Sequence, residues 1–339
     1  MKELSFSLLL GIFFLASSSP MEGSLSQRVN EFLKGCKLAK AVSYKNLTLL
    51  PIVPAESKKL PKILTLDEAS KGDKLVISEV GEGDVNRVSI QNNSNAYVFI
   101  MAGEILTGCK QDRVLKYDTL IPPKSEKFIV PVYCVEAGRW HWSSPRFAPA
   151  PAMASVSVRR KAEVAKSQTE VWGEISYMMS ELSARVPGEA LKGVYDVPFV
   201  KDEMEDYFKA LREIPRDYPD AKGVAVAIGD EILCVDIFCE RSLFENLYPK
   251  LLKSYILEAL AKKKSRGKTT MDKVMDFLES LSKADVVIGE KPPAGDLLEM
   301  ETPQVKGSAL VFHQQVIHLS AFPKKEGIQE VPSIFRRYR

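Results

Sequence analysis

The stretch from Tyr97 to Glu104 reads YVFIMAGE, and the stretch from Phe128 to Glu136 reads FIVPVYCVE. Both are continuous apolar runs rather than alternating ones, which is typical of strands that are covered on both faces. Pro131 interrupts the second run. Because proline cannot donate to a sheet ladder, it favours an edge or a bulge at this position. Each run ends at a glutamate, so the two strands carry carboxylates to the end of a buried sheet.

Strands are also expected on either side of these runs. From about residue 41 to residue 158, short apolar runs lie between turn residues, for example Leu75–Val80 and Val85–Gln91, and this pattern predicts strands. A short helix is expected before them at Ser24–Leu33. The proline- and alanine-rich stretch Phe147–Ala152 breaks the pattern and is predicted to be a connecting loop.

Helical periodicity takes over in the second half of the chain. Apolar residues with a 3.6-residue spacing predict one long amphipathic helix from Val164 to Leu182. Further elements are predicted by turn, capping and strand signals. They are a helix at Met204–Leu211, a hairpin at Val224–Cys239 that turns at Gly229-Asp230, a helix opened by the capping box Ser242–Glu245, a helix from Thr269, and strands at Ala309–Phe312 and Val316–Phe322.

The length and composition of the chain are those of one large globular domain. The chain has 339 residues, of which 45% are hydrophobic and 27% charged, an ordinary globular balance. We expect an α+β fold in which residues 24–339 form a single domain with two lobes, a β-rich one at about 24–158 and an α+β one at about 159–339. The 47 basic against 44 acidic side chains leave a net charge of +3, which argues against a nucleic-acid partner.

The N-terminus predicts a secretory signal. Residues 4–16 read LSFSLLLGIFFLA, an uncharged run shorter than the ~20 residues of a membrane-spanning helix. Small residues follow it, as a cleavage site requires. We therefore expect residues 1–18 to be a signal peptide and the mature protein to be periplasmic or extracellular, without stable membrane insertion. The alternative is a cytoplasmic protein that starts at Met21, which the odd number of cysteines favours.

The cysteines and histidines predict neither a metal site nor a cofactor. The five cysteines form no CxxC pair, and only three histidines are present, whereas a zinc site needs four well-spaced ligands. Cys134 lies within an apolar run and is interpreted as a small buried hydrophobic residue. The basic run KKKSRGK at 262–268 follows a helix and is expected to be a solvated loop.

Two carboxylates are candidates for catalysis. Glu104 and Glu136 follow the two apolar runs, and a carboxylate at the end of a buried strand must find a partner or raise its pKa. Either glutamate can then serve as a general base or orient a water molecule. The sequence does not decide whether the protein is an enzyme.

Candidate ligand-binding residues lie close to these carboxylates in the sequence. Arginine forks suit phosphate or carboxylate oxygens, and a tryptophan can stack on a base or another flat ring. A histidine in the last strand shares a face with a serine, a pattern that is more often structural than ligand-binding. The ligand-binding candidates are Gln111, Arg113, Arg139, Trp140 and His318.

The same residues fit a second interpretation. Glu104 or Glu136 can form a structural ion-pair network with Arg113 or Arg139 that closes the end of a sheet. The protein would then be a non-catalytic exported binding module whose surface contacts a protein or a glycan. Convergence of the four side chains on one open cleft favours the first interpretation, and burial in mutual pairs favours the second.

Six segments carry a resemblance to a known family. They are GEILTG at 103–108, KQDRV at 110–114, VPVYCVE at 130–136, GRW at 138–140, QTEVW at 168–172 and VIHLSAF at 316–322. In these segments the chain resembles the domain family named for its association with ADP-ribosylglycohydrolases and rhodanese-phosphatases, over about residues 40–325. The family name implies a phosphate-bearing small molecule of the ADP-ribose or nucleotide type. Apart from His318, all of the candidate residues fall on the central motifs.

Overall fold

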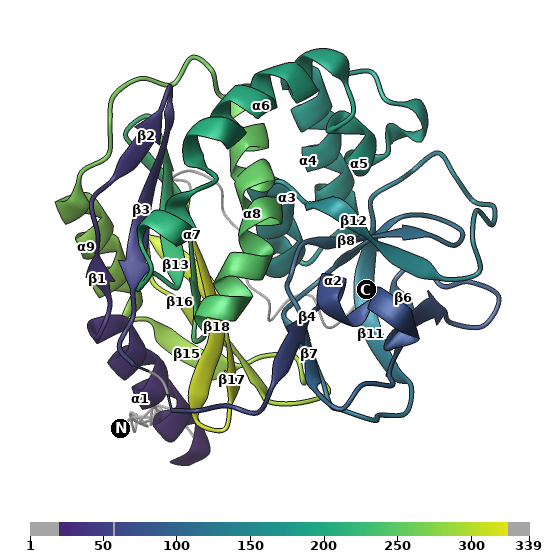
Figure 1. Cartoon of the computed structure of the whole chain (residues 1–339), viewed down its shortest axis with the longest axis horizontal. Coiled ribbons are helices and arrows are strands. Elements are labelled where there is room, and N and C mark those ends of the chain that lie inside the picture. Colours follow the sequence, from purple (N-terminus) through teal and green to yellow (C-terminus); the bar gives the residue numbers. More distant parts are fainter. Residues whose placement is uncertain (1–19, 57, 325–339) are drawn as a thin grey trace, which may run out of the picture.

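The computed structural model describes residues 20–56 and 58–324 (Figure 1). These residues form an α+β fold whose strands lie in three sheets, which confirms the expected fold class. The predicted signal peptide at residues 1–18 lies outside the described residues. Within the two described ranges, no helix is long and apolar enough to cross a membrane.

The largest sheet joins the N-terminal strands to the C-terminal ones. Its nine strands are antiparallel, in the order β1-β3-β13-β14-β18-β17-β16-β15, with β2 paired to β3. The strands are β1 (Lys37–Leu38), β2 (Val42–Tyr44), β3 (Leu47–Val53), β13 (Gly223–Ile228), β14 (Glu231–Phe238), β15 (Asp285–Ile288), β16 (Asp296–Glu301), β17 (Val305–Phe312) and β18 (Gln315–Pro323).

Two smaller sheets form the β-rich part of the molecule. One has the order β12-β8-β9-β11-β6-β5 and the other β10-β7-β4, in which β4 and β7 run parallel. Their strands are β4 (Ile63–Thr65), β5 (Leu75–Glu79), β6 (Arg87–Asn92), β7 (Tyr97–Ile100), β8 (Glu104–Gly108), β9 (Arg113–Leu115), β10 (Thr119–Ile121), β11 (Phe128–Cys134) and β12 (Phe147–Met153).

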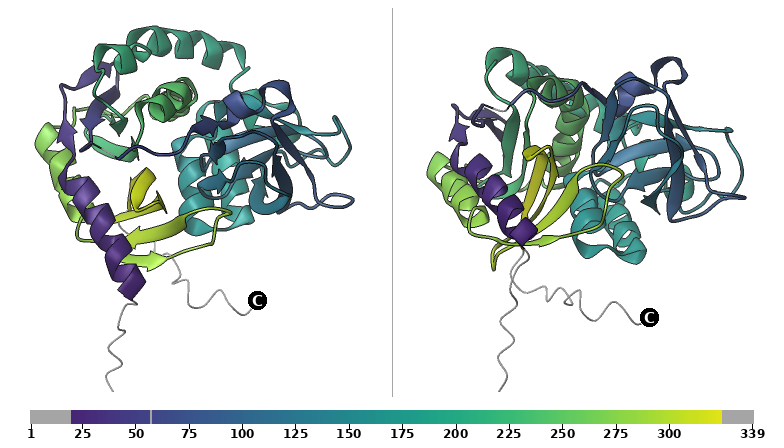
Figure 2. Two further views of the ribbon diagram at one scale, coloured as in Figure 1. Left: turned by 60° about the horizontal axis from the view of Figure 1, so that its bottom comes forward. Right: turned by 90° about the horizontal axis from the view of Figure 1, so that it is seen from below.

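Helices cover both faces of the nine-stranded sheet. Figure 2 shows α1 and α9 along its outer face and α8 on its inner face. The helices are α1 (Pro20–Lys34), α2 (Leu66–Ala69), α3 (Val156–Arg160), α4 (Gln168–Glu181), α5 (Leu191–Val194), α6 (Pro198–Leu211), α7 (Ile214–Asp217), α8 (Arg241–Ala261) and α9 (Met271–Leu281), with single turns η1 (Lys71–Asp73), η2 (Lys161–Ala165) and η3 (Pro187–Glu189).

Strand alternation divides the apolar residues of this sheet between two cores. In β3, Leu50 and Ile52 belong to the core under α1 and α9, whereas Leu47 and Leu49 belong to the core around α8. The reason is that successive side chains of a strand point to opposite faces. The core around α8 also contains residues of the β-rich part, such as Phe99. The β-rich part and the nine-stranded sheet therefore share the core around α8.

Several expected elements are confirmed. The structure contains the leading helix, the strands over both apolar runs and the hairpin that turns at Gly229-Asp230. Pro131 lies in β11 at the point where this strand changes its partner from β6 to β9. A missing N–H group is tolerated at such a break in the ladder, so the proline marks an irregularity, as expected, although β11 is not an edge strand.

Three local predictions are wrong. The expected loop Phe147–Ala152 is strand β12, because this strand lies at the edge of its sheet and only one side of it must pair. Helix α8 begins at Arg241 after Glu240, without a side-chain cap, so Ser242–Glu245 is not a capping box. The long helix expected from Val164 is broken at Lys166, which has a φ of 54°, and α4 begins only at Gln168.

Candidate functional site

Arg139 lies at the centre of the polar cluster that the sequence predicts. Its Nη2 contacts Glu136 Oε2 at 2.6 Å and Asp112 Oδ1 at 3.1 Å, and its Nε donates to Glu136 Oε2 at 2.9 Å. Its Nη1 donates to the carbonyl oxygen of Cys109 at 2.6 Å and to Ser143 Oγ at 2.9 Å. Every nitrogen of this guanidinium therefore has protein partners, and only 12% of the side chain is exposed.

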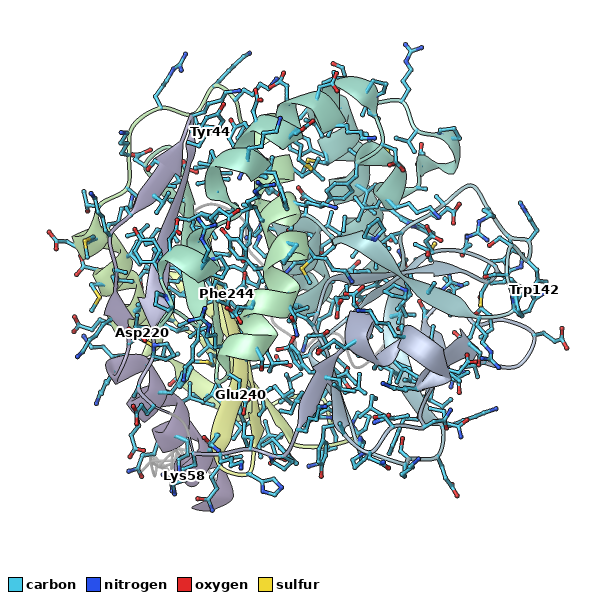
Figure 3. The ribbon with its side chains drawn as sticks, viewed as in Figure 1. Tyr44, Lys58, Trp142, Asp220, Glu240 and Phe244 are labelled. Atoms are coloured by element: carbon cyan, nitrogen blue, oxygen red, sulfur yellow. The ribbon has the colours of Figure 1, made fainter. Side chains whose placement is uncertain are left out.

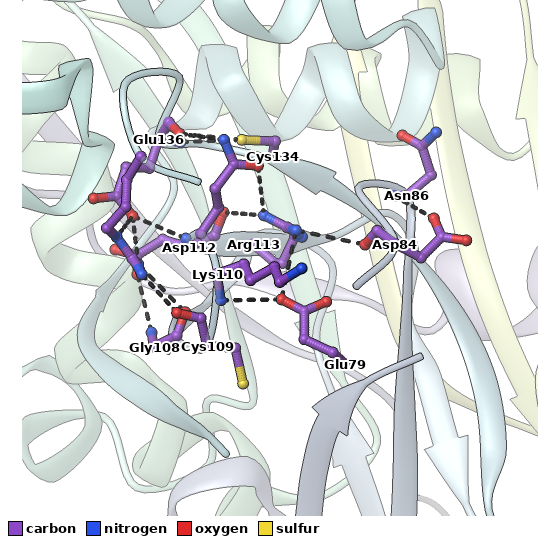
Figure 4. Close-up of polar contacts among 12 residues, drawn as sticks. Glu79, Asp84, Asn86, Gly108, Cys109, Lys110, Asp112, Arg113, Cys134 and Glu136 are labelled. Atoms are coloured by element: carbon purple, nitrogen blue, oxygen red, sulfur yellow. Dashed lines mark hydrogen bonds and ion pairs between the residues drawn. The ribbon is translucent and has the colours of Figure 1, made fainter. Parts of the chain in front are cut away.

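The two carboxylates that face Arg139 also hold the backbone in place. Glu136 Oε2 accepts from the Asp112 amide at 3.0 Å, and Asp112 Oδ1 accepts from the Gly108 amide at 3.0 Å (Figure 4). Lys192 Nζ contacts Asp112 Oδ2 at 3.0 Å. Burial opposes ionisation of Glu136, but the hydrogen bonds from Arg139 and the Asp112 amide, together with the charges of Arg139 and Lys192, outweigh it and lower the pKa of Glu136. Glu136 is therefore held as a paired carboxylate, which makes it a weak base.

Arg113 is enclosed within the same cluster. Its guanidinium is fully buried, with Nη2 3.7 Å from Glu79 Oε1 and Nη1 3.1 Å from Gln111 Oε1 (Figure 4). The amide of Gln111 donates in turn to the carbonyl oxygen of Glu136 at 3.1 Å. Gln111, Arg113, Glu136 and Arg139 thus lie together, as expected, but their polar atoms are directed at one another and at the backbone.

Glu104 lies outside this cluster. Its carboxylate is fully buried beside α8 and α2, where Lys250 Nζ contacts Glu104 Oε1 at 3.1 Å and Asp67 Oδ2 at 2.5 Å. Burial raises the pKa of Glu104, and Lys250 counters this effect. Glu104 and Glu136 therefore do not form one acid–base pair.

His318 also lies outside the cluster, in the interior of the molecule. Its Nδ1 contacts Asp118 Oδ2 at 2.6 Å, and its Nε2 is 3.5 Å from Asp236 Oδ1. Burial disfavours the charged imidazole, but Asp118 and Asp236 outweigh it and raise the pKa of His318 to about 9. Because the side chain is fully buried, His318 has no access to a ligand at the surface.

Asp236 connects His318 to a larger set of buried charges. Its carboxylate contacts Arg159 Nη2 at 2.5 Å and accepts a hydrogen bond from the Tyr255 hydroxyl at 2.6 Å. Arg159 Nε is 4.0 Å from Glu163 Oε1, and burial raises the pKa of Glu163 to about 7. We call Asp118, Arg159, Glu163, Asp236 and His318 the buried network. Of its members only His318 was singled out from the sequence, because Asp118, Asp236 and His318 lie far apart along the chain.

A surface with two tryptophans lies over the Arg139 cluster. Trp140 and Trp142 are 49% and 50% exposed, and Lys110 Nζ lies 5.1 Å and 5.5 Å from the centres of their rings. Gly83 makes room for the lysine, since a Cβ atom there would lie 2.8 Å from Lys110 Cδ. We call Lys110, Trp140 and Trp142 the tryptophan surface. Lys110 was not among the predicted residues, although it stands in the KQDRV motif.

The fold and the cluster define an α+β protein in which ion pairs hold a loop with two exposed tryptophans. The chain belongs to the family of the ARG and Rhodanese-Phosphatase-superfamily-associated Protein domain, which matches residues 35–322. This match confirms the resemblance found in the sequence motifs. No curated protein and no solved structure matches the chain.

Proposed function

We propose that this protein binds a phosphate-bearing small molecule with a flat ring, of the nucleotide or ADP-ribose type, on the tryptophan surface. The ring stacks on an indole of Trp140 or Trp142, and a phosphate oxygen meets the ammonium of Lys110. In this proposal Glu136 and Arg139 are positioning residues, and the cluster does no acid–base catalysis. The observation that carries the proposal is the ammonium of Lys110 between two half-exposed indoles.

The charges around the surface support an anionic ligand. Arg113, Arg139 and Lys192 each face a carboxylate. Among the described residues, Lys110 has no carboxylate within ion-pair distance and contacts indole rings instead. Such a cation–π contact contributes about 0.5–1 kcal/mol at an exposed site, less than a charge-assisted hydrogen bond to phosphate.

The attachment of the loop supports a preformed surface. Arg139 binds the turn at 108–112, and the Gly138 amide donates to the Gly188 carbonyl oxygen at 3.0 Å. A Cβ atom on Gly138 would lie 2.6 Å from Gly188 Cα, so only glycine permits this approach. A surface held in this way loses little entropy when a ligand binds.

Tryptophan fluorescence tests the proposal directly. The chain has three tryptophans, and the third, Trp172, lies on α4, so the Trp172→Phe variant emits only from the tryptophan surface. We expect AMP and ADP-ribose to quench this emission saturably and ribose 5-phosphate to bind more weakly, because stacking contributes roughly 1–3 kcal/mol per base. Lys110→Met should weaken binding about tenfold, and Lys124→Met, at an exposed lysine on another turn, should not. No saturable quenching, or equal binding by Lys110→Met, would contradict the proposal.

Mutual burial of the charges also supports the second interpretation, a non-catalytic exported module with a glycan ligand. Neutral oligosaccharides should then quench the same emission, and Lys110→Met should leave that binding unchanged. Export itself is tested by the N-terminus of the purified protein, which should begin near residue 19.

A further inference from the structure

A cavity of about 490 Å³ lies at the opposite side of the molecule from the tryptophan surface. Figure 3 shows Tyr44, which precedes the lining residue Lys45, far from Trp142 of the tryptophan surface. The cavity is lined by the turn between β2 and β3, by α6 and by the segment after α8. We propose that it binds a small molecule carrying two or more phosphate charges, independently of the function proposed for the tryptophan surface.

Hydrogen bonds of Asn46 join the three segments that line this cavity. The Asn46 side-chain amide donates to the carbonyl oxygens of Ala259 at 2.9 Å and Lys262 at 3.0 Å, at the end of α8. Its Oδ1 accepts from the Tyr207 hydroxyl at 2.7 Å. One side chain thus fixes the β2–β3 turn, α6 and the end of α8 relative to one another. A cavity whose three walls are joined in this way keeps its shape before a ligand arrives.

The basic segment after α8 is also fixed. It is solvent-exposed, as the sequence predicts, but it packs against the turn of the β13–β14 hairpin. A Cβ atom on Gly229, which has a φ of 62°, would lie 2.5 Å from the Arg266 carbonyl oxygen, and the Thr269 amide donates to the Gly229 carbonyl oxygen at 3.1 Å. The backbone of the segment is therefore held in place along the cavity wall.

Cations outnumber carboxylates in the lining. Lys45, Lys263 and Arg266 face one glutamate, Glu203, which pairs with Lys263. Lys45 Nζ is 4.0 Å from Asp206 Oδ2 at the rim and lies over the ring of Tyr207. Within the described ranges, the guanidinium of Arg266 has no hydrogen-bond or ion-pair partner. Arg266 is therefore free to make the bidentate contact that phosphate oxygens favour.

The size and the donors of the cavity indicate the class of ligand. A volume of about 490 Å³ lies within the roughly 300–1,000 Å³ of small-molecule sites and exceeds what one inorganic phosphate fills. Cationic side chains stand on two different walls, Lys45 on the β2–β3 turn and Arg266 on the segment after α8. Ser265 adds a hydroxyl donor. Cations on two walls suit two separated anionic groups better than a single one.

Calorimetric titration of the full chain with inorganic pyrophosphate tests this site, since pyrophosphate has no ring to stack on a tryptophan. Arg266→Gln should weaken binding at least tenfold, and Lys45→Gln several-fold. The matched control is Lys268→Gln, an exposed lysine of the same basic run that does not line the cavity. Glu203→Gln should strengthen binding several-fold, because it removes a like charge and releases Lys263. Citrate, a carboxylate anion of similar charge, should bind more weakly than pyrophosphate.

Three outcomes would overturn the inference. They are no measurable pyrophosphate binding by the unmodified protein, equal weakening by Arg266→Gln and Lys268→Gln, and binding of citrate as tight as that of pyrophosphate. The second would show diffuse attraction by the basic run instead of a site, and the third would show the wrong ligand class. Because the tryptophan surface is tested by fluorescence with ring-bearing ligands, a failure at one site is distinguishable from a failure at the other.

Discussion

Arg139 and Arg159 make the same kind of contact in two very different regions. Each arginine lies between two carboxylates, Arg139 between Asp112 and Glu136, and Arg159 between Asp236 and Glu163. Arg139 is 12% exposed and holds a surface loop, whereas Arg159 is fully buried between the β-rich part and the nine-stranded sheet. The partners of Arg139 lie 3 and 27 residues away, while Arg159 and Asp236 are 77 residues apart.

The comparison shows that charges concentrated in one stretch of sequence and charges buried in the core have different roles. A dense local cluster forms a structural attachment at the surface, because loops bring neighbouring residues together without help from the core. The buried network carries the larger electrostatic cost, since its charges have left water entirely and depend on one another. The buried network therefore rests mainly on contacts between residues that are far apart in the sequence, such as Arg159 and Asp236.

Removal of the buried arginine should have the largest effect. We expect Arg159→Met to lower the free energy of unfolding by about 3–5 kcal/mol, because Asp236 then loses its closest counter-charge in the interior. Urea denaturation measures this loss. The double variant Arg159→Met/Asp236→Asn should recover part of it. A single-variant loss below about 1 kcal/mol would show that the buried network contributes no more than a surface pair.

The pH dependence of stability tests the buried network in a second way. The pKa of Glu163 is raised from 4.5 to about 7 and that of His318 from 6.5 to about 9, so the folded state binds protons more tightly than the unfolded state. Their stabilisation is complete at low pH and is lost as pH rises, from 4.5 to 7 for Glu163 and from 6.5 to 9 for His318. Stability in urea should therefore fall between pH 5 and pH 9, by on the order of 3 kcal/mol for each of the two groups. Glu163→Gln should flatten the lower part of this profile, and a rise across the whole range would contradict the assignment.

The matched substitution at the surface should have the smallest effect. Arg139→Met should cost about 1–2 kcal/mol, since water can reach Glu136 once the guanidinium is gone. Hydrogen exchange of the backbone amides in residues 137–146 should accelerate, whereas exchange in α8 should not change. If Arg139→Met destabilises the protein as much as Arg159→Met does, the surface cluster is part of the core, and the distinction between the two regions fails.

Much of the fold followed from residue patterns that act over short distances. The apolar runs at 97–101 and 128–135 predicted strands, and the Gly229-Asp230 turn predicted its hairpin, because periodicity and turn geometry are local properties. The stretch Phe147–Ala152 was misread because its two prolines are tolerated only at a sheet edge. Edge position depends on how the whole sheet is assembled, which no local pattern records.

The candidate site was predicted in part for the same reason. Glu136 and Arg139 are three residues apart, so their proximity could be expected from the sequence. Glu104 was grouped with them because it follows a similar strand, but that strand places it against Lys250 of α8, 146 residues further on. Lys110 was not chosen because nothing in the motif distinguishes it from the other charges beside it.

The sequence by itself determined the α+β class, the positions of the main strands and helices, the family, and the place along the chain where charges concentrate. These follow from periodicity, turn chemistry and motif spacing. The tertiary structure alone decided which charges pair with one another and that Arg113 and His318 are sealed from solvent. It also decided that the β2–β3 turn, α6 and the segment after α8 line one basic cavity. The physical reason is that burial and ion pairing depend on distances through space, and folding joins residues as far apart as Asp118 and His318, which are separated by 200 positions.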